Sequence, residues 1–114
     1  MANLLLRLLA EEPDVAVVGN ADNARTALAE IESRRPDLLI LDLALREGSG
    51  FDVLERLQAR RRPRPAALVL SNLTSSYYRE RAAELGAAAF YDKSRDIALM
   101  LGHVRRLARP RAAS

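Results

Sequence analysis

At 114 residues the chain is long enough for one domain with a single hydrophobic core and too short for two. Hydrophobic residues make up 49% of it and charged residues 29%, which excludes wholesale disorder. The net charge of +3 is modest, the absence of cysteine excludes disulfides and thiolate metal sites, and no apolar run reaches the roughly 20 residues of a membrane helix.

The predicted elements alternate between helices and strands. The first helix has leucines at helical spacing and ends at Pro13; because Arg7 interrupts its apolar run, we interpret it as a helix and not a signal peptide. Short apolar runs predict strands over residues 14–19, 38–41, 66–70 and 87–91. Apolar faces at helical spacing predict further helices around residues 24–31, 51–57, 78–85 and 97–104.

This alternation is typical of α/β proteins. It predicts an open parallel sheet of about four strands with right-handed crossovers, and about five helices that cover both faces. We expect one domain over residues 1–108, followed by a flexible basic tail over residues 109–114, with no room for an output domain.

The run from Leu38 to Leu41 is the most informative of the strands. It is continuously apolar, as in strands buried on both faces of a parallel sheet, and it ends abruptly at Asp42. A Gly-Ser-Gly turn follows at residues 48–50. Because ligands and chemistry gather beyond the carboxyl ends of such strands, Asp42 is the first candidate site residue.

Two later strands also end in residues that carry chemistry. Ser71 follows the run over residues 66–70, and Lys93, the sole lysine, follows the run over residues 87–91. Neighbouring strands lie about 4.8 Å apart, so a carboxylate, a hydroxyl and an ammonium can converge on one small volume. Asp42 can then attack phosphorus as a carboxylate nucleophile, while Lys93 and Ser71 bind the new phosphoryl group.

The energies of such contacts are large enough to switch a conformation. A charge contact at 4 Å contributes about 4 kcal/mol at an effective dielectric constant of 20. A hydrogen bond to a charged group adds roughly 1.5–3 kcal/mol, and inverting a two-state population takes about 5.5 kcal/mol. The alternative is structural: Asp42 caps a turn, Ser71 caps a helix and Lys93 is a solvated charge.

At these residues the chain resembles the receiver domains of bacterial two-component response regulators, which have a flavodoxin-like fold. The motifs PDLLILDLALREGSGFDVLERL, LVLSN and ELGAAAFYDKS carry the resemblance, which covers nearly the whole chain. It implies that Asp42 is the phosphoacceptor, Ser71 the switch hydroxyl, Lys93 the family lysine, Phe90 the switch aromatic, and Ala44 a backbone carbonyl ligand of Mg²⁺.

The resemblance also implies partners and a cellular setting. A histidine kinase or phosphotransfer protein would donate the phosphoryl group, and a downstream protein target would read the switched face. Such a stand-alone receiver would be cytoplasmic and would catalyse only its own phosphoryl transfer and hydrolysis, so it is not conventionally an enzyme. The competing hypothesis is a pseudo-receiver, a phosphorylation-independent interaction module that could be dimeric.

The front of the chain departs from the family pattern. Receivers begin with a strand that carries an acidic pair for Mg²⁺, whereas this chain begins in the helix that should follow that strand. Three explanations are open: the chain is an N-terminally truncated version, the strands around Val17 and Ile40 pair directly, or a second chain fills the gap. Asn72 is a smaller departure, since the family usually has a smaller side chain there.

The missing pair makes Mg²⁺ binding weak or doubtful, because only Asp42 and the Ala44 carbonyl remain as obvious ligands. Glu11, Glu12 and Asp14 lie at the opposite end of the predicted sheet and cannot substitute. We therefore expect the chain to be phosphorylated poorly.

Other residues favour structural roles. His103 is more consistent with an ordinary surface histidine than with a phosphorelay histidine. Two arginine-rich stretches, residues 60–64 and 105–111, suggest nucleic acid, but aromatic residues make up only 4% of the chain and no recognition helix is evident, so we consider nucleic-acid binding unlikely. The aromatic residues Tyr77, Tyr78, Phe90 and Tyr91 could serve packing or a partner surface, and the sequence does not separate these.

Overall fold

The computed structural model describes residues 2–59 and 65–108. The helices are α1 (Ala2–Ala10), α2 (Ala24–Arg34), α3 (Gly50–Gln58), α4 (Ser76–Glu84) and α5 (Ile97–Ala108). The strands are β1 (Leu38–Leu41), β2 (Ala66–Ser71) and β3 (Ala89–Asp92). The basic stretch at 60–64 and the predicted tail at 109–114 lie outside the described residues.

The three strands form one parallel sheet in the order β1-β2-β3. Leu38 is paired with Ala66 at the start of the β1–β2 ladder, and Ser71 is paired with Asp92 at the end of the β2–β3 ladder. The three carboxyl ends therefore meet at one edge of the sheet, as the sequence predicted.

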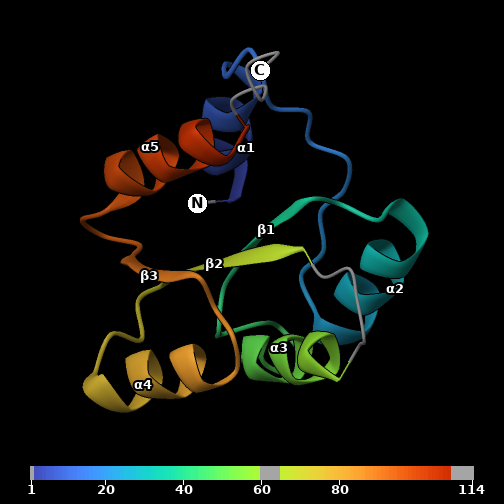
Figure 1. Cartoon of the computed structure of the whole chain (residues 1–114), viewed down its shortest axis with the longest axis vertical. Coiled ribbons are helices and arrows are strands. Elements are labelled where there is room, and N and C mark those ends of the chain that lie inside the picture. The colour runs from blue at the N-terminus through green and yellow to red at the C-terminus, as the bar shows by residue number, and fades with distance from the viewer. Residues whose placement is uncertain (1, 60–64, 109–114) are drawn as a thin grey trace, which may run out of the picture.

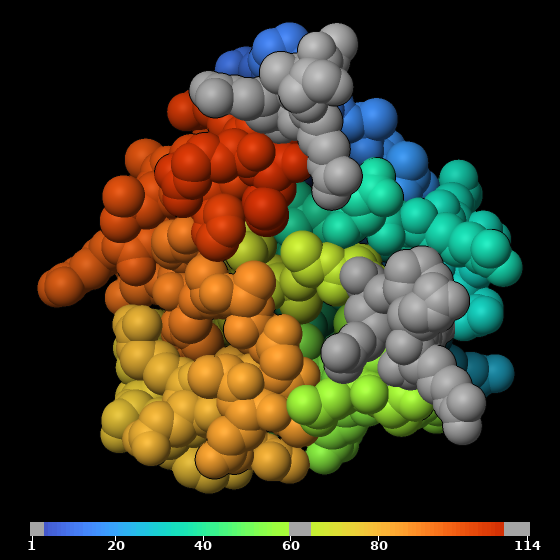
Figure 2. All heavy atoms as spheres, viewed as in Figure 1, coloured from blue at the N-terminus to red at the C-terminus, as the bar shows by residue number. Residues whose placement is uncertain are grey.

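Helices cover both faces of this sheet (Figure 1). Alternate residues of β2 point to opposite sides: Ala67 and Val69 pack with α2, α3 and α4, whereas Leu68 and Leu70 pack with α1 and α5. All four side chains are buried. In the view of Figure 2, only a small part of β2 reaches the surface. The predicted open parallel sheet with helices on both faces is confirmed, as is the number of helices in the described residues.

Local signals set the ends of several helices. Asn23 caps α2 by accepting a hydrogen bond from the Thr26 backbone N–H at 2.8 Å. Ser49 and Asp52 form a reciprocal capping box at the start of α3. Gly86, just after α4, has a φ of +94°, a conformation that glycine adopts without strain.

The predicted strand over residues 14–19 is wrong. In the described residues the segment forms no strand, and the sheet has three strands where four were expected (Figure 1). Val17 and Val18 are each 45% exposed, so direct pairing with the strand around Ile40 is wrong as well. The physical reason is that a strand needs a neighbouring strand to complete its backbone hydrogen bonds. The residues that follow this segment, Asp22 and Ala24, instead form backbone hydrogen bonds with Arg46 and Glu47 and not with β1.

None of the helices in residues 2–59 and 65–108 combines the length and the hydropathy that a membrane crossing requires.

Candidate functional site

Asp42 lies directly after β1, between two buried leucines, Leu41 and Leu43. Its Oδ1 atom accepts a hydrogen bond from the Ala44 backbone N–H at 3.0 Å. A Cβ atom on Gly50 would lie 2.6 Å from the Asp42 carbonyl oxygen, so the start of α3 packs directly on this backbone. The carboxylate is therefore held at the sheet edge by its own turn and by a glycine contact.

Lys93 reaches Asp42 from the end of β3. Its Nζ atom donates to Asp42 Oδ2 in an ion pair, and the two side chains are 18% and 27% exposed. The backbone N–H of Lys93 also donates to the carbonyl of Ser71 at 3.0 Å, which extends the β2–β3 ladder by one residue. The pair is thus partly shielded from solvent, and its attraction is screened less than that of a fully exposed pair.

Ser71 is fully buried at the end of β2, at the same edge of the sheet. Its hydroxyl oxygen accepts a hydrogen bond from the Leu73 backbone N–H at 3.1 Å. In the part of the chain that the structure describes, no bond joins this hydroxyl to Asp42. The structure therefore brings Asp42 and Lys93 into contact and leaves Ser71 beside them, linked to Lys93 through the backbone.

Phe90 lies on β3, three residues before Lys93, and is half-buried. The guanidinium carbon of Arg79 lies 4.8 Å from the centre of its ring, and Arg79 Nε donates to the Thr74 carbonyl at 2.9 Å. Arg79 thus connects Phe90 with the loop that follows Ser71. Sequence reasoning missed Arg79, because a cation–π contact between two elements leaves no local pattern.

The donor set at this edge supplies few ligands for a magnesium ion. The described residues contain no group of three or more acidic, histidine or cysteine side chains that could hold a metal. Asp42 is the carboxylate of the ion pair, and both of its oxygens are engaged, by Ala44 and by Lys93. Mg²⁺ prefers carboxylate oxygens in near-octahedral geometry, which one engaged carboxylate and the Ala44 carbonyl do not supply.

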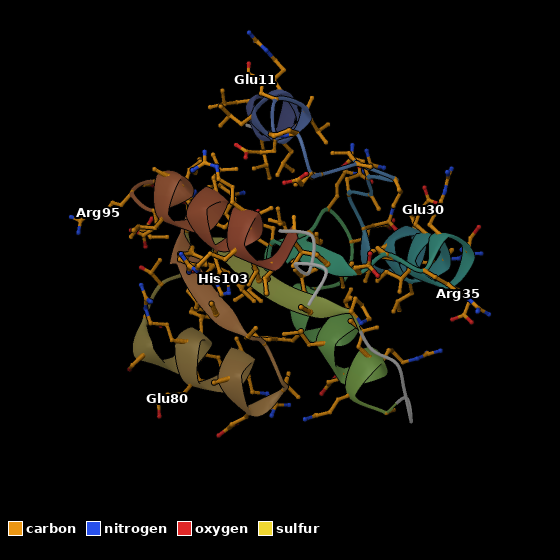
Figure 3. All side chains as sticks on the ribbon, turned by 45° about the horizontal axis from the view of Figure 1, so that its top comes forward. Glu11, Glu30, Arg35, Glu80, Arg95 and His103 are labelled. Carbon is orange, nitrogen blue, oxygen red and sulfur yellow. The ribbon has the colours of Figure 1, made fainter. Side chains whose placement is uncertain are left out.

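The acidic residues near the first helix serve another purpose. Glu12 accepts two hydrogen bonds from Arg105 of α5, at 2.8 and 3.0 Å. These bonds and the charge of Arg105 hold the pKa of the Glu12 carboxyl below its usual value and raise the pKa of Arg105. Figure 3 shows Glu11 on the α1 side of the molecule, away from the sheet.

His103, the histidine of α5, has a partner on the sheet. Its Nδ1 atom lies 2.7 Å from the hydroxyl of Tyr91 on β3, and the two rings meet edge to face. Figure 3 shows His103 on the side of α5 that faces the sheet. On α4, Tyr78 stacks on Phe51 of α3, whereas Tyr77 is 64% exposed.

Comparison with protein families identifies one match. The model of the response regulator receiver domain matches residues 1–105.

Curated relatives match about four fifths of the chain. The chain is 40% identical over 93 residues to a protein-glutamate methylesterase/protein-glutamine glutaminase of Methylobacillus flagellatus, covering 80% of this chain and 26% of that protein. A protein of the same name from Methanospirillum hungatei is 39% identical over 92 residues, covering 79% and 27%. The chain therefore spans about a quarter of the length of these relatives.

Solved structures share the fold. The signal receiver domain of the putative response regulator NarL of Mycobacterium tuberculosis has a TM-score of 0.83 at 27% identity, covering 96% of this chain and 87% of that one. The response regulator domain of Thermotoga maritima CheB also has a TM-score of 0.83, at 19% identity, covering 97% and 90%.

Proposed function

The chain belongs to the family of response regulator receiver domains, which act in two-component signalling, and we propose that it accepts a phosphoryl group on Asp42. The observation that carries the proposal is the ion pair between Asp42 and Lys93 at the carboxyl edge of the sheet. A carboxylate held beside a single ammonium is both a nucleophile for phosphorus and the start of a binding site for the product.

The proposed transfer uses only groups of this chain and its donor. A carboxylate oxygen of Asp42 attacks the phosphorus of a phosphohistidine on a histidine kinase or phosphotransfer protein. The P–N bond breaks and the imidazole leaves with the electron pair. Asp42 is then an acyl phosphate, so the new phosphoryl oxygens replace its former carboxylate charge as the partner of Lys93. Reorientation of the Ser71 hydroxyl would add a hydrogen bond of roughly 1.5–3 kcal/mol.

The switch would pass through Phe90. We propose that movement of the loop after Ser71 toward the phosphoryl group disturbs the contact of Arg79 with Thr74 and Phe90, and so alters the face that a downstream target reads. Arg79 supports this proposal because it contacts both the loop and the ring.

Receiver domains in general bind Mg²⁺. For this chain we propose weak binding at most, through Asp42 and the Ala44 carbonyl, and therefore slow phosphorylation. We also propose a cytoplasmic location, in keeping with a sequence that has no cysteine. The methylesterase activity named for the curated relatives is not proposed here, because the match spans about a quarter of them.

The test is phosphoryl labelling with a small phosphodonor such as acetyl phosphate in the presence of Mg²⁺. We expect slow, less than stoichiometric labelling of the wild-type chain, located at Asp42 by mass spectrometry. Asp42→Asn should abolish it, whereas Asp37→Asn, at the other end of β1, should leave it unchanged. Equal labelling of wild type and Asp42→Asn would contradict the proposal, and no label at all would favour the phosphorylation-independent interaction module.

A further inference from the structure

The side of β1 that faces away from β2 has backbone groups without partners. The Ala66 N–H donates to the Asp37 carbonyl at 3.0 Å, where Leu38 is paired with Ala66. Because successive backbone groups of a strand point to opposite sides, the N–H and C=O groups of Leu38 and Ile40 point away from β2. Among the described residues, no backbone hydrogen bond reaches these groups. We call them the open edge of β1.

The side chains of β1 do not protect this edge. Edge strands of monomeric proteins are usually interrupted by a charged residue, a proline or a bulge, whereas Leu38–Leu41 is apolar throughout. The first three of these side chains are only half-buried, although Ala67–Ser71 of the neighbouring β2 are buried. An apolar strand with one unbonded side is a template on which a further strand can pair.

The segment between α1 and α2 passes this edge without bonding to it (Figure 1). At one end, Val15 packs against the same buried cluster as two side chains of β1. At the other end, the Arg46 N–H donates to the Asp22 carbonyl, in the loop that follows β1. Between these two anchors, residues 16–20 are all exposed. The chain's own strand-forming residues therefore leave the edge uncovered.

The charges at the ends of β1 favour a basic partner. Asp37 directly precedes the strand and is exposed, and it forms no ion pair with any residue that the structure describes. Asp42, at the other end, is already paired with Lys93. A segment that brings a lysine or arginine beside Asp37 would therefore gain an ion pair there.

We propose that the open edge of β1 binds an extended segment of a partner protein, apolar over the four residues of β1 and flanked by a basic residue. The partner's backbone completes the hydrogen bonds of Leu38 and Ile40, and its basic residue pairs with Asp37. A second copy of the chain is a poorer occupant, because its exposed segment begins with Asp14 and has no basic residue through position 19. This interaction does not depend on phosphorylation of Asp42.

The test is amide hydrogen exchange of the whole chain, followed by NMR, with the blocked peptide Lys-Val-Leu-Val-Leu-Lys. A lysine at both ends lets one of them reach Asp37 in either strand direction. At saturating peptide, the Leu38 and Ile40 amides should exchange at least about tenfold more slowly. The matched control is Lys-Val-Pro-Pro-Leu-Lys, which lacks a backbone donor on each side of the strand and should not slow exchange.

Charge reversal tests the chemistry of the partner. Asp37→Lys should weaken binding of the lysine peptide by about two- to fivefold. The same variant should bind a matched peptide with glutamates in place of the lysines more tightly than the wild-type chain does. Because the Asp37 side chain is exposed, this variant keeps the core intact. Equal binding of the lysine and glutamate peptides to the wild-type chain would overturn the basic partner.

Three other results would overturn the proposal. The first is unchanged exchange of Leu38 and Ile40 at millimolar peptide, or an equal effect of the proline peptide. The second is protection that appears at the outer edge of β3 and not at these two amides. The third is slow exchange of both amides that rises with protein concentration in the absence of peptide, since a second copy would then occupy the edge.

Discussion

The central strand β2 and the segment of residues 14–19 differ in how their backbones are bonded, although both are apolar and rich in strand-forming residues. β2 has a parallel neighbour on each side, and Ala67–Ser71 are buried. Residues 14–19 pair with no strand in the described chain, and Val17 and Val18 remain 45% exposed. The difference teaches that strand propensity becomes a strand only where a neighbour satisfies the backbone hydrogen bonds.

The candidate site depends on the bonded region alone. Asp42 and Lys93 follow β1 and β3, and Ser71 is the last residue of β2, so all three are positioned by one continuous ladder and need nothing from residues 14–19. An experiment that compares the stability of the sheet with that of residues 14–19 therefore also tests whether the site is built on the more stable of the two regions.

Amide hydrogen exchange should give the largest contrast. We expect the amides of Leu68, Val69 and Leu70 to exchange only by global unfolding, at least about 10³-fold more slowly than those of Val17 and Val18. NMR or mass spectrometry of the intact chain measures both regions in one experiment. Comparable protection of the two regions would show that residues 14–19 have found a bonding partner in solution.

Gly50→Ala should give the next largest effect, a loss of stability, because the added methyl group disrupts the contact between α3 and the Asp42 backbone. The new Cβ atom would lie 2.6 Å from a carbonyl oxygen, so backbone must shift, and we expect a loss of about 3 kcal/mol in unfolding free energy. Denaturant unfolding provides the measurement. Gly102→Ala in α5 is the matched control: its Cβ atom would meet only the end of Arg106, at 3.9 Å, and should stabilise by roughly 0.5–1 kcal/mol. Equal effects of the two variants would contradict the close packing of α3 on Asp42.

Truncating one valine in each region to alanine should give a smaller difference in unfolding free energy, with the larger loss again in β2. Val69→Ala removes two buried methyl groups from β2 and should cost about 2 kcal/mol. Val17→Ala removes half-exposed methyl groups and should cost less than about 0.5 kcal/mol. The midpoint of denaturant unfolding reports both, and a Val17→Ala cost equal to that of Val69→Ala would place residues 14–19 in the core.

The smallest expected effect concerns Glu12 and Arg105, which link the segment before residues 14–19 to α5. Because the folded pKa of Glu12 is lowered, the pair stabilises the fold above the usual pKa of 4.5, and this contribution is lost as the pH falls through the folded value. Unfolding measured between pH 7 and pH 3 should therefore show a slightly weaker pH dependence in Glu12→Gln than in wild type. Glu11→Gln, beside it in the sequence, is the control that removes a neighbouring carboxylate and keeps the bonds between Glu12 and Arg105.

The order of the helices and the strands that form the sheet could be predicted from local patterns. Asn23, Ser49 and Gly86 carry their capping roles in residue type and position alone, so the ends of α2, α3 and α4 were accessible. The convergence of Asp42 and Lys93 also followed from the pattern, because parallel strands bring their carboxyl ends to one edge. The conformation of residues 14–19 could not be predicted in this way, because forming a strand there depends on a neighbouring strand, which no local pattern describes.

What the sequence by itself determined is the alternation of apolar runs and helical faces, and with it an α/β sheet that ends in an acid, a hydroxyl and an amine. Only the tertiary structure decided which groups touch. It paired Lys93 with Asp42, turned the Ser71 hydroxyl toward its own loop, placed Arg79 over Phe90 and joined Asn72 to Ser94. These contacts link residues that are distant in the chain or depend on the final path of a loop, so their geometry is set by packing and not by local propensity.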